Sequence, residues 1–347
     1  MRQLKIQPVI YEYDNLKEFS KEFRIGKDDL IITSQKLYFE YLKDYIKESA
    51  LIFIENYGHG DLSDTMVELI YESVKKITYE RIIAIGDDSV LQLGKIFSLK
   101  NLVPLSDLFN NKLEISKEKE LVLVPAICGI GNEVTNISTL KFREKVCRKQ
   151  LAVDELYADS AVLIPQLLNQ LTFNIFAESS MKTFMYAVET YLSPKANEYT
   201  QLFSEMAVKI ILNGYKKIES EGSNIYHSLL RNFLLAGNYT GISLSNTGAG
   251  ILQDSVYKLA DKYDNISYAD AEKLIFTTVL KKYEKISLNE TMIKFRNIIS
   301  SQLVCDENNI YYKIDELLDN ILPGKTIEEY GIEKKNLNDL LEDIMEN

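Results

Sequence analysis

Apolar and polar positions follow two different patterns along the 347-residue chain. Up to about Pro165, short apolar runs bounded by turn residues alternate with segments of helical spacing, as expected for buried parallel strands and their connecting helices. Four such runs predict strands at Leu30–Ser34, Leu51–Glu55, Arg81–Gly86 and Leu121–Ala126. Between them, apolar residues at helical spacing predict helices over Asp61–Ile77 and Ser89–Leu99.

After Pro165 the β-rich runs stop, and amphipathic helical patterns take their place. The clearest ones cover Thr183–Tyr191, Tyr199–Tyr215, Asp270–Tyr283 and Lys335–Met345. The sequence therefore predicts an α/β protein, with a parallel-sheet domain of the dinucleotide-binding type over residues 1–165 and an all-helical domain over residues 166–347. Without a long Gly/Ser linker, we expect the domains to pack closely and to hold a small-molecule ligand in the cleft between them.

Composition narrows the classes of partner. A net charge of -11 and a pI near 5.0 argue against binding to nucleic acid, whose phosphates would be repelled. No stretch approaches the ~20 apolar residues of a membrane helix, and the N-terminus lacks the apolar core of a secretory signal. Cys128, Cys147 and Cys305 are widely spaced and odd in number, which favours reduced thiols. We expect a cytoplasmic protein without membrane contact.

The first candidate for chemistry is Ile82–Lys95, in which an apolar strand ends in a glycine turn and a helix begins. This geometry offers free backbone N–H groups to a phosphate. Asp87 and Asp88, however, stand where the backbone should approach a pyrophosphate, and like charges at short range repel each other. The alternative is that both aspartates cap the helix N-terminus, which general cap preferences favour.

A second glycine-bearing loop, Pro125–Thr135, follows the last predicted strand. Gly129 and Gly131 would let the backbone approach a ligand, and Cys128 would supply a thiol. A nucleophilic cysteine needs an activating partner, and the chain has two histidines only, at positions 59 and 227. A lone thiol is therefore favoured over a catalytic cysteine.

The ordered motifs of the chain resemble those of the iron-type (group III, metal-dependent) alcohol dehydrogenases, and within that family the branch that acts on 4-hydroxybutyrate. They are GDDSVLQLGK from Gly86, PAICGIGNEVT from Pro125, SSMKTFMYAVETYLSPKANEYT from Ser179 and SNTGAGILQDSVYKL from Ser245. The resemblance covers essentially the whole chain and implies a dehydroquinate synthase-like fold, hydride transfer between two domains, and a homodimer. It breaks off at the C-terminus, where we expect a final helical segment to be lacking.

The family's four metal ligands, one aspartate and three histidines, map by this resemblance onto Lys182, Tyr186, Gln253 and Tyr268. None of these is a usable ligand, and a lysine ammonium would be repelled by a divalent ion. His59 and His227 lie far from these positions along the chain and are interpreted as ordinary surface or cap histidines. We therefore expect no bound metal.

The nucleotide motif is altered as well. Family members carry a run of glycines where this chain has Asp87 and Asp88, and an aspartate at the position of Gln92. Gly86, Ser89 and Lys95 still match the family pattern. In the second loop, residues that carry hydroxyl groups in the family are replaced by Ala126, Ile127 and Ile130, while the matching residues are Gly129, Gly131, Glu133, Val134 and Thr135. Lys149 matches a lysine that contacts the cofactor in relatives. These changes leave the binding of NAD(P) open.

Three functions follow from these residues. The leading hypothesis is a catalytically silent relative, a pseudoenzyme with a binding or regulatory role. The alternative is an NAD(P)-dependent oxidoreductase that interconverts 4-hydroxybutyrate and succinic semialdehyde, or a similar pair, without metal. In that case Lys182 would supply positive charge and Tyr186 or Tyr268 a proton. The third is a working family enzyme that holds metal through unrecognised ligands.

Overall fold

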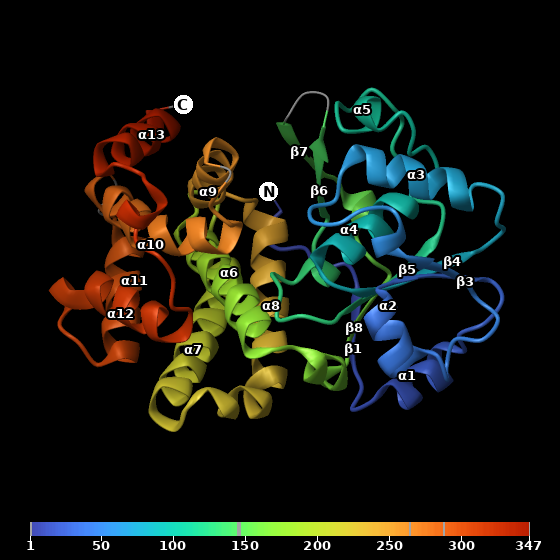
Figure 1. The fold of residues 1–347 in the computed structure, drawn as a ribbon, viewed down its shortest axis with the longest axis horizontal. Helices are drawn as coiled ribbons and strands as arrows, with labels where there is room; N and C mark the ends of the chain where they lie inside the picture. The colour runs from blue at the N-terminus through green and yellow to red at the C-terminus, as the bar shows by residue number, and fades with distance from the viewer. Residues whose placement is uncertain (1, 144–146, 264, 287–288, 347) are drawn as a thin grey trace. The chain divides into compact units, whose positions relative to one another are not determined.

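The computed structural model describes residues 2–143, 147–263, 265–286 and 289–346. The chain forms two compact units, Lys5–Gln170 and Leu171–Asn347, the second of which includes Met1–Leu4 (Figure 1). The domain boundary expected after residue 165 falls a few residues before this division. An α/β unit followed by a helical unit is the fold class that the sequence predicts, and it is confirmed.

A six-stranded parallel sheet forms the centre of the first unit, in the order β1–β8–β5–β4–β2–β3. Its strands are β1 (Val9–Glu12), β2 (Asp29–Thr33), β3 (Ala50–Phe53), β4 (Arg81–Gly86), β5 (Glu120–Pro125) and β8 (Ser160–Leu163). Strands β2 to β5 are the four that the apolar runs predict. Strands β1 and β8 have four residues each and pair with each other at one side of the sheet.

Side chains that alternate along the strands build a core on each face of the sheet. On one face Ile82 and Ala84 pack with α3 (Asp64–Val74) and α4 (Asp88–Phe97). The short helix α5 (Leu105–Leu108) adds to the same core. Helices α1 (Leu16–Phe23) and α2 (Gln35–Leu37) lie on the opposite side, and the π-helical turn η1 (Tyr38–Leu42) continues α2 (Figure 1).

An antiparallel hairpin follows the second glycine loop and was not predicted. It consists of β6 (Ile137–Phe142) and β7 (Cys147–Ala152). Leu140, Phe142 and Leu151 of the hairpin belong to the core that α3 and α4 share. The hairpin therefore fixes the end of the loop that leads into it.

The second unit is helical over the residues described. Its helices are α6 (Phe173–Leu192), α7 (Glu198–Glu221), α8 (Tyr226–Thr247), α9 (Ile251–Lys262), α10 (Tyr268–Ile286), α11 (Glu290–Leu303), α12 (Ile310–Ile321) and α13 (Lys334–Glu346). The four expected helices exist as α6, α7, α10 and α13, but their predicted ends were wrong, because all four are longer. Among the described residues, no helix is long and apolar enough to span a membrane.

Candidate functional site

The two glycine loops lie next to each other at the carboxyl edge of the sheet. Strands β4 and β5 are neighbours, and Gly86 at the end of β4 pairs in register with Pro125 at the end of β5. Ligands of open α/β sheets bind at this edge. A Cβ atom on Gly86 would lie 2.7 Å from Cβ of Val90, so the close approach of α4 to its own strand already requires glycine there.

The two aspartates of the first loop have different roles. Oδ1 of Asp87 accepts hydrogen bonds from the backbone N–H groups of Ser89 and Val90, at 3.0 and 3.1 Å. The cap interpretation is therefore confirmed for Asp87. The carboxylate of Asp88 instead accepts a hydrogen bond of 2.8 Å from Nδ2 of Asn132, in the second loop. Asp88 thus joins the two loops.

Lys95 is a second connection between these loops. Its side chain is fully buried, and Nζ donates to Oγ1 of Thr135 at 2.6 Å and to the carbonyl of Ile137 at 2.9 Å. Burial lowers the pKa of Lys95 to about 7, although the nearby carboxylates of Glu133 and Asp88 act in the opposite direction. This lysine holds the second loop and the hairpin against α4.

Two further positions named from the sequence have protein partners. Nζ of Lys149, on β7, donates to Oδ1 of Asn110 at 2.5 Å and lies 5.6 Å from the centre of the Phe142 ring. Oε1 of Gln92 accepts a hydrogen bond of 2.6 Å from the backbone N–H of Thr139. Both side chains therefore fix the hairpin.

Cys128 fits the interpretation as a lone thiol. It is buried and forms no disulfide, and burial raises the pKa of its thiol well above the usual value. A thiol that resists deprotonation is a poor nucleophile. Cys147 and Cys305 form no disulfide either.

The four positions that the resemblance relates to metal ligands lie on three helices of the second unit. Lys182 and Tyr186 are on α6, Gln253 is in the first turn of α9, and Tyr268 begins α10. Lys182 and Tyr186 are four residues apart, which places them on one face of α6. Lys182 is partly exposed and Tyr186 is buried.

Contacts connect two of these positions through a residue that sequence reasoning missed. Nε2 of Gln253 donates to the hydroxyl of Tyr257 at 2.8 Å. The rings of Tyr257 and Tyr268 meet edge to face, with centroids 5.7 Å apart. The hydroxyl of Tyr268 donates to Asp261 at 3.3 Å. Tyr257 follows Gln253 by one helical turn, and this spacing was a signal that could have identified it.

Glu189 connects α6 to α9 and was also missed. Its Oε1 accepts hydrogen bonds from the backbone N–H groups of Leu252, at 2.7 Å, and Gln253, at 3.3 Å. The N-cap of α9 is Gly250, which has no side chain to cap the helix, and a Cβ there would lie 2.8 Å from Oε1. The carboxylate of Glu189 therefore replaces a local cap.

Burial raises the pKa of Glu189 to about 7. The backbone donors of Leu252, Gly250 and Gln253 act in the opposite direction, because they favour the charged carboxylate. The side chain is three residues from Tyr186 and seven from Lys182, so all three lie on the same side of α6. Glu189 thus anchors the turn of α9 that carries Gln253 to the helix that carries Lys182 and Tyr186.

Comparisons with known proteins show which family has this sequence pattern and fold. Residues 7–165 match the family model for iron-containing alcohol dehydrogenase, and residues 176–347 match the model for the C-terminal part of the Fe-containing alcohol dehydrogenase family. The chain is 35% identical over 346 residues to 4-hydroxybutyrate dehydrogenase of Clostridium kluyveri, covering 100% of this chain and 93% of that protein. The chain belongs to the iron-containing alcohol dehydrogenase family.

A second relative and a solved structure are similar at lower sequence identity. Long-chain-alcohol dehydrogenase 1 of Geobacillus thermodenitrificans is 24% identical over 279 residues, which cover 77% of this chain and 69% of that protein. The crystal structure of sulfoacetaldehyde reductase from Bifidobacterium kashiwanohense in complex with NAD+ superposes with a TM-score of 0.82 at 16% identity. It covers 99% of this chain and 92% of that chain, and it supports the fold.

Members of the iron-containing alcohol dehydrogenase family usually bind a metal ion and NAD(P). The donor set at the aligned positions does not fit a metal, because an ammonium, an amide and two phenols replace carboxylate and imidazole. Within the described parts of the chain, no group of three His, Cys, Asp or Glu side chains could hold an ion. His59 is exposed in a bend of the first unit, and the ring of His227 lies against that of Tyr226 in the second, with centroids 4.0 Å apart.

The backbone of the first unit fits a dinucleotide better than its side chains do. Helix α4 begins at the carboxyl edge of the sheet, where backbone N–H groups suit a pyrophosphate. The N–H groups of Ser89 and Val90 donate to the carboxylate of Asp87. Because the side chain of Asp87 is exposed, a change of its rotamer would free both N–H groups for a phosphate. A cap of this kind stabilises by roughly 0.5–2 kcal/mol, so Asp87 weakens phosphate binding without blocking the site.

Proposed function

We propose that the protein is an oxidoreductase that interconverts 4-hydroxybutyrate and succinic semialdehyde, or a similar small alcohol and aldehyde, without a bound metal ion. The similarity over the full length to 4-hydroxybutyrate dehydrogenase of Clostridium kluyveri carries this proposal. It favours an active enzyme over the silent relative that the altered motifs first suggest. The homodimer and the cytoplasmic location stay predictions.

The chemistry assigned to this chain replaces an ion by side chains. An alcohol oxygen develops negative charge as it exchanges a hydride, and that charge needs a positive partner. We assign this role to the ammonium of Lys182, which stands at the position of the family's aspartate ligand. The proton passes to or from a phenol, either Tyr186, on the same face of α6, or Tyr268 at the start of α10.

NAD(P)H would supply the hydride when bound in the first unit. The residues that would hold its phosphates are Ser89 and Val90, through their backbone N–H groups, once Asp87 turns away. Gly129 and Gly131 of the second loop would allow close approach of the backbone. Asp88 and Lys95 hold the two loops together, through Asn132 and Thr135.

The proposal is tested by adding NADH or NADPH and succinic semialdehyde to the purified protein in the presence of a metal chelator. We expect catalytic reduction of the aldehyde, measured as the loss of NAD(P)H absorbance. Butyraldehyde, which lacks the carboxylate, serves as the matched substrate for specificity. If neither aldehyde, nor any other small aldehyde, is turned over with either dinucleotide, the proposed activity is wrong.

Replacing both loop aspartates by asparagine should strengthen dinucleotide binding. Asparagine caps a helix as well as aspartate does and can still accept a hydrogen bond from Asn132, so the change removes charge and keeps structure. Repulsion between a carboxylate and a nearby phosphate is on the order of 1 kcal/mol or more, and ~10-fold tighter binding of NADH follows. Fluorescence titration of the Asp87→Asn, Asp88→Asn double variant measures it.

The matched control for this variant is Asp28→Asn. Asp28 is exposed and directly precedes β2, at the amino edge of the sheet, away from the loops. It should leave the dissociation constant unchanged. Equal binding by the double variant and the wild type would show that Asp87 and Asp88 do not face the phosphates.

A further inference from the structure

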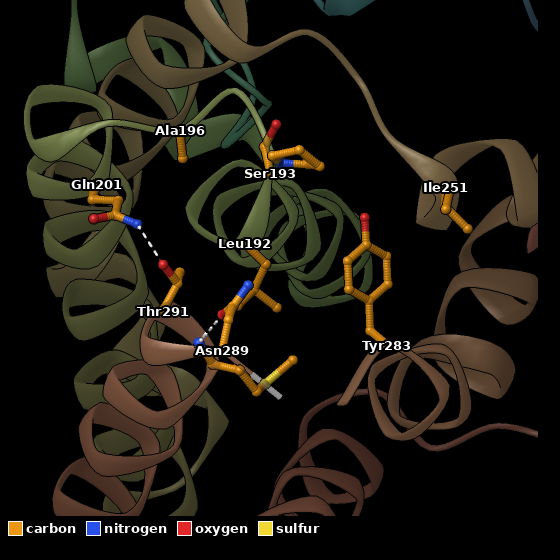
Figure 2. A pocket seen from close by; sticks show the side chains of 10 residues that line it. Leu192, Ser193, Ala196, Gln201, Ile251, Tyr283, Asn289 and Thr291 are labelled. Atoms are coloured by element: carbon orange, nitrogen blue, oxygen red, sulfur yellow. Dashed lines mark hydrogen bonds between the residues drawn. The ribbon is translucent and has the colours of Figure 1, made fainter. Parts of the chain in front are cut away.

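The helical unit contains a cavity that the proposed activity does not use. It has a volume of about 400 Å³ and lies among the end of α6, the start of α7, α10 and the start of α11 (Figure 2). Its described lining residues are Leu192, Ser193, Pro194, Ala196, Gln201, Ile251, Tyr283, Asn289, Thr291 and Met292. The volume falls in the range of pockets that bind small molecules, which is roughly 300–1,000 Å³.

The wall of this cavity is mixed, and the described lining carries no ionised side chain. Apolar surface comes from Leu192, Pro194, Ala196, Ile251 and Met292. Polar groups come from separate helices, with Gln201 on α7, Tyr283 on α10 and Thr291 on α11. A pocket with a mostly apolar wall and a few convergent polar groups is the usual form of a small-molecule site.

The polar groups of Tyr283 and Gln201 have spare hydrogen-bonding capacity. The hydroxyl of Tyr283 points into the space between Ile251 and Ser193 in Figure 2 and makes no hydrogen bond with any described residue. Nε2 of Gln201 reaches only Oγ1 of Thr291, at 3.5 Å, and the carbonyl of Tyr191, at 3.4 Å. Both distances are longer than a normal hydrogen bond, so a ligand atom at about 2.9 Å would bind better.

A carboxyl group near the cavity selects against anions when it is ionised. Glu189 is one helical turn before Leu192 and binds the N–H of Leu252, next to the lining residue Ile251. Burial of the Tyr283 hydroxyl and the nearby charge of Glu189 both raise the pKa of Tyr283, which keeps that hydroxyl neutral and able to donate. A carboxylate ligand would be repelled by Glu189 wherever that group is ionised.

We propose that this cavity is a binding site for a small uncharged molecule that carries a short apolar chain and at least one hydroxyl or amide group. Tyr283, Gln201 and Thr291 hold its polar end, and Leu192, Ile251 and Met292 contact its apolar part. The site does not depend on the proposed activity, because none of its lining residues belongs to the assigned catalytic set. Where Glu189 is ionised, the site also discriminates by charge, so an alcohol enters and a hydroxy acid of the same length does not.

The test uses the full chain without dinucleotide, at about pH 8.5, above the pKa of about 7 of Glu189, and follows 1,4-butanediol by saturation-transfer NMR. The wild type should show saturable binding. Ala196→Phe fills the cavity from a partly exposed loop position and should lower the affinity at least 10-fold, whereas Lys195→Phe, an exposed neighbour outside the lining, should not. Tyr283→Phe should weaken binding about 3- to 10-fold, the effect of one lost hydrogen bond.

Two controls locate the bound diol. Lys182→Met should bind it as the wild type does, because Lys182 lies outside the cavity lining. 4-Hydroxybutyrate, the anionic molecule of the same chain length, should not displace the fraction of binding that Ala196→Phe removes. Thermal unfolding confirms that each variant is folded. The proposal is overturned if the wild type shows no saturable binding, if Ala196→Phe binds the diol equally well, or if 4-hydroxybutyrate displaces it.

Discussion

Lys182→Met should lower kcat for the reduction of succinic semialdehyde by at least 100-fold while leaving the fold intact. The physical reason is the loss of the positive charge assigned to the developing alkoxide. Removing one electrostatic partner of an oxyanion costs about 100- to 1,000-fold in kcat, or ~2.7–4 kcal/mol. Methionine keeps the length and apolar stem of lysine, and α6 tolerates it because the position is only partly buried.

The measurement is steady-state kinetics in chelator, accompanied by thermal unfolding. Lys182→Arg is the matched variant, because it keeps the charge, and it should retain more activity than Lys182→Met. KM should change less than kcat, since the charge acts on the transition state. A kcat within threefold of the wild type in Lys182→Met would mean that this ammonium does not replace the ion.

The wild type should lose stability as the pH rises from about 4.5 to about 7, because Glu189 becomes charged in the folded protein. The Glu189→Gln variant should not show this loss. The ordinary pKa of 4.5 applies to Glu189 in the unfolded chain, and burial raises it to about 7 in the folded protein. The folded state therefore keeps its proton over a range in which the unfolded state loses it. The contribution to stability is full below pH 4.5 and is lost as the pH rises through 7.

The size of this effect follows from the pKa difference and is on the order of 3 kcal/mol at pH 8. Glutamine does not titrate, and its Oε1 can still accept from the N–H groups of Leu252 and Gln253. Chemical unfolding should show the two proteins equally stable near pH 4.5 and the variant more stable at pH 8. The exposed carboxylate of Glu221, at the end of α7, provides the control Glu221→Gln, which should follow the wild type.

One result would contradict the burial of an ionisable carboxyl at Glu189. If the difference in unfolding free energy between the wild type and Glu189→Gln is constant from pH 4.5 to 8, this carboxyl is not desolvated in solution. Glu189→Ala separates the cap from the charge. It leaves backbone N–H groups of α9 without their acceptor and should destabilise the protein at both ends of the pH range.

Much of the fold follows from local pattern. Strands β2, β4 and β5 are apolar runs because each is covered on both faces, and residues such as Ile82 and Ile83 are fully buried on opposite faces. Strand β7 was missed because CRKQLA is mostly polar, with Leu151 its buried residue. Strand β1 was missed because it is a short, mostly exposed edge strand.

The site was harder to predict, because its important contacts join residues far apart in the chain. The cap by Asp87 is local, and the sequence indicates it. Glu189 lies more than 60 residues before the helix it caps, and no local pattern reveals such a partner. Lys95 was known only as a retained motif residue, and its complete burial against Thr135 depends on packing.

The central claim, an iron-containing alcohol dehydrogenase scaffold that works without metal, is tested most directly by elemental analysis of protein that is turning over succinic semialdehyde. We predict far less than one equivalent of iron, zinc or other divalent metal per chain, and a kcat that is the same before and after chelation. A stoichiometric, tightly bound metal whose removal abolishes turnover would contradict the account.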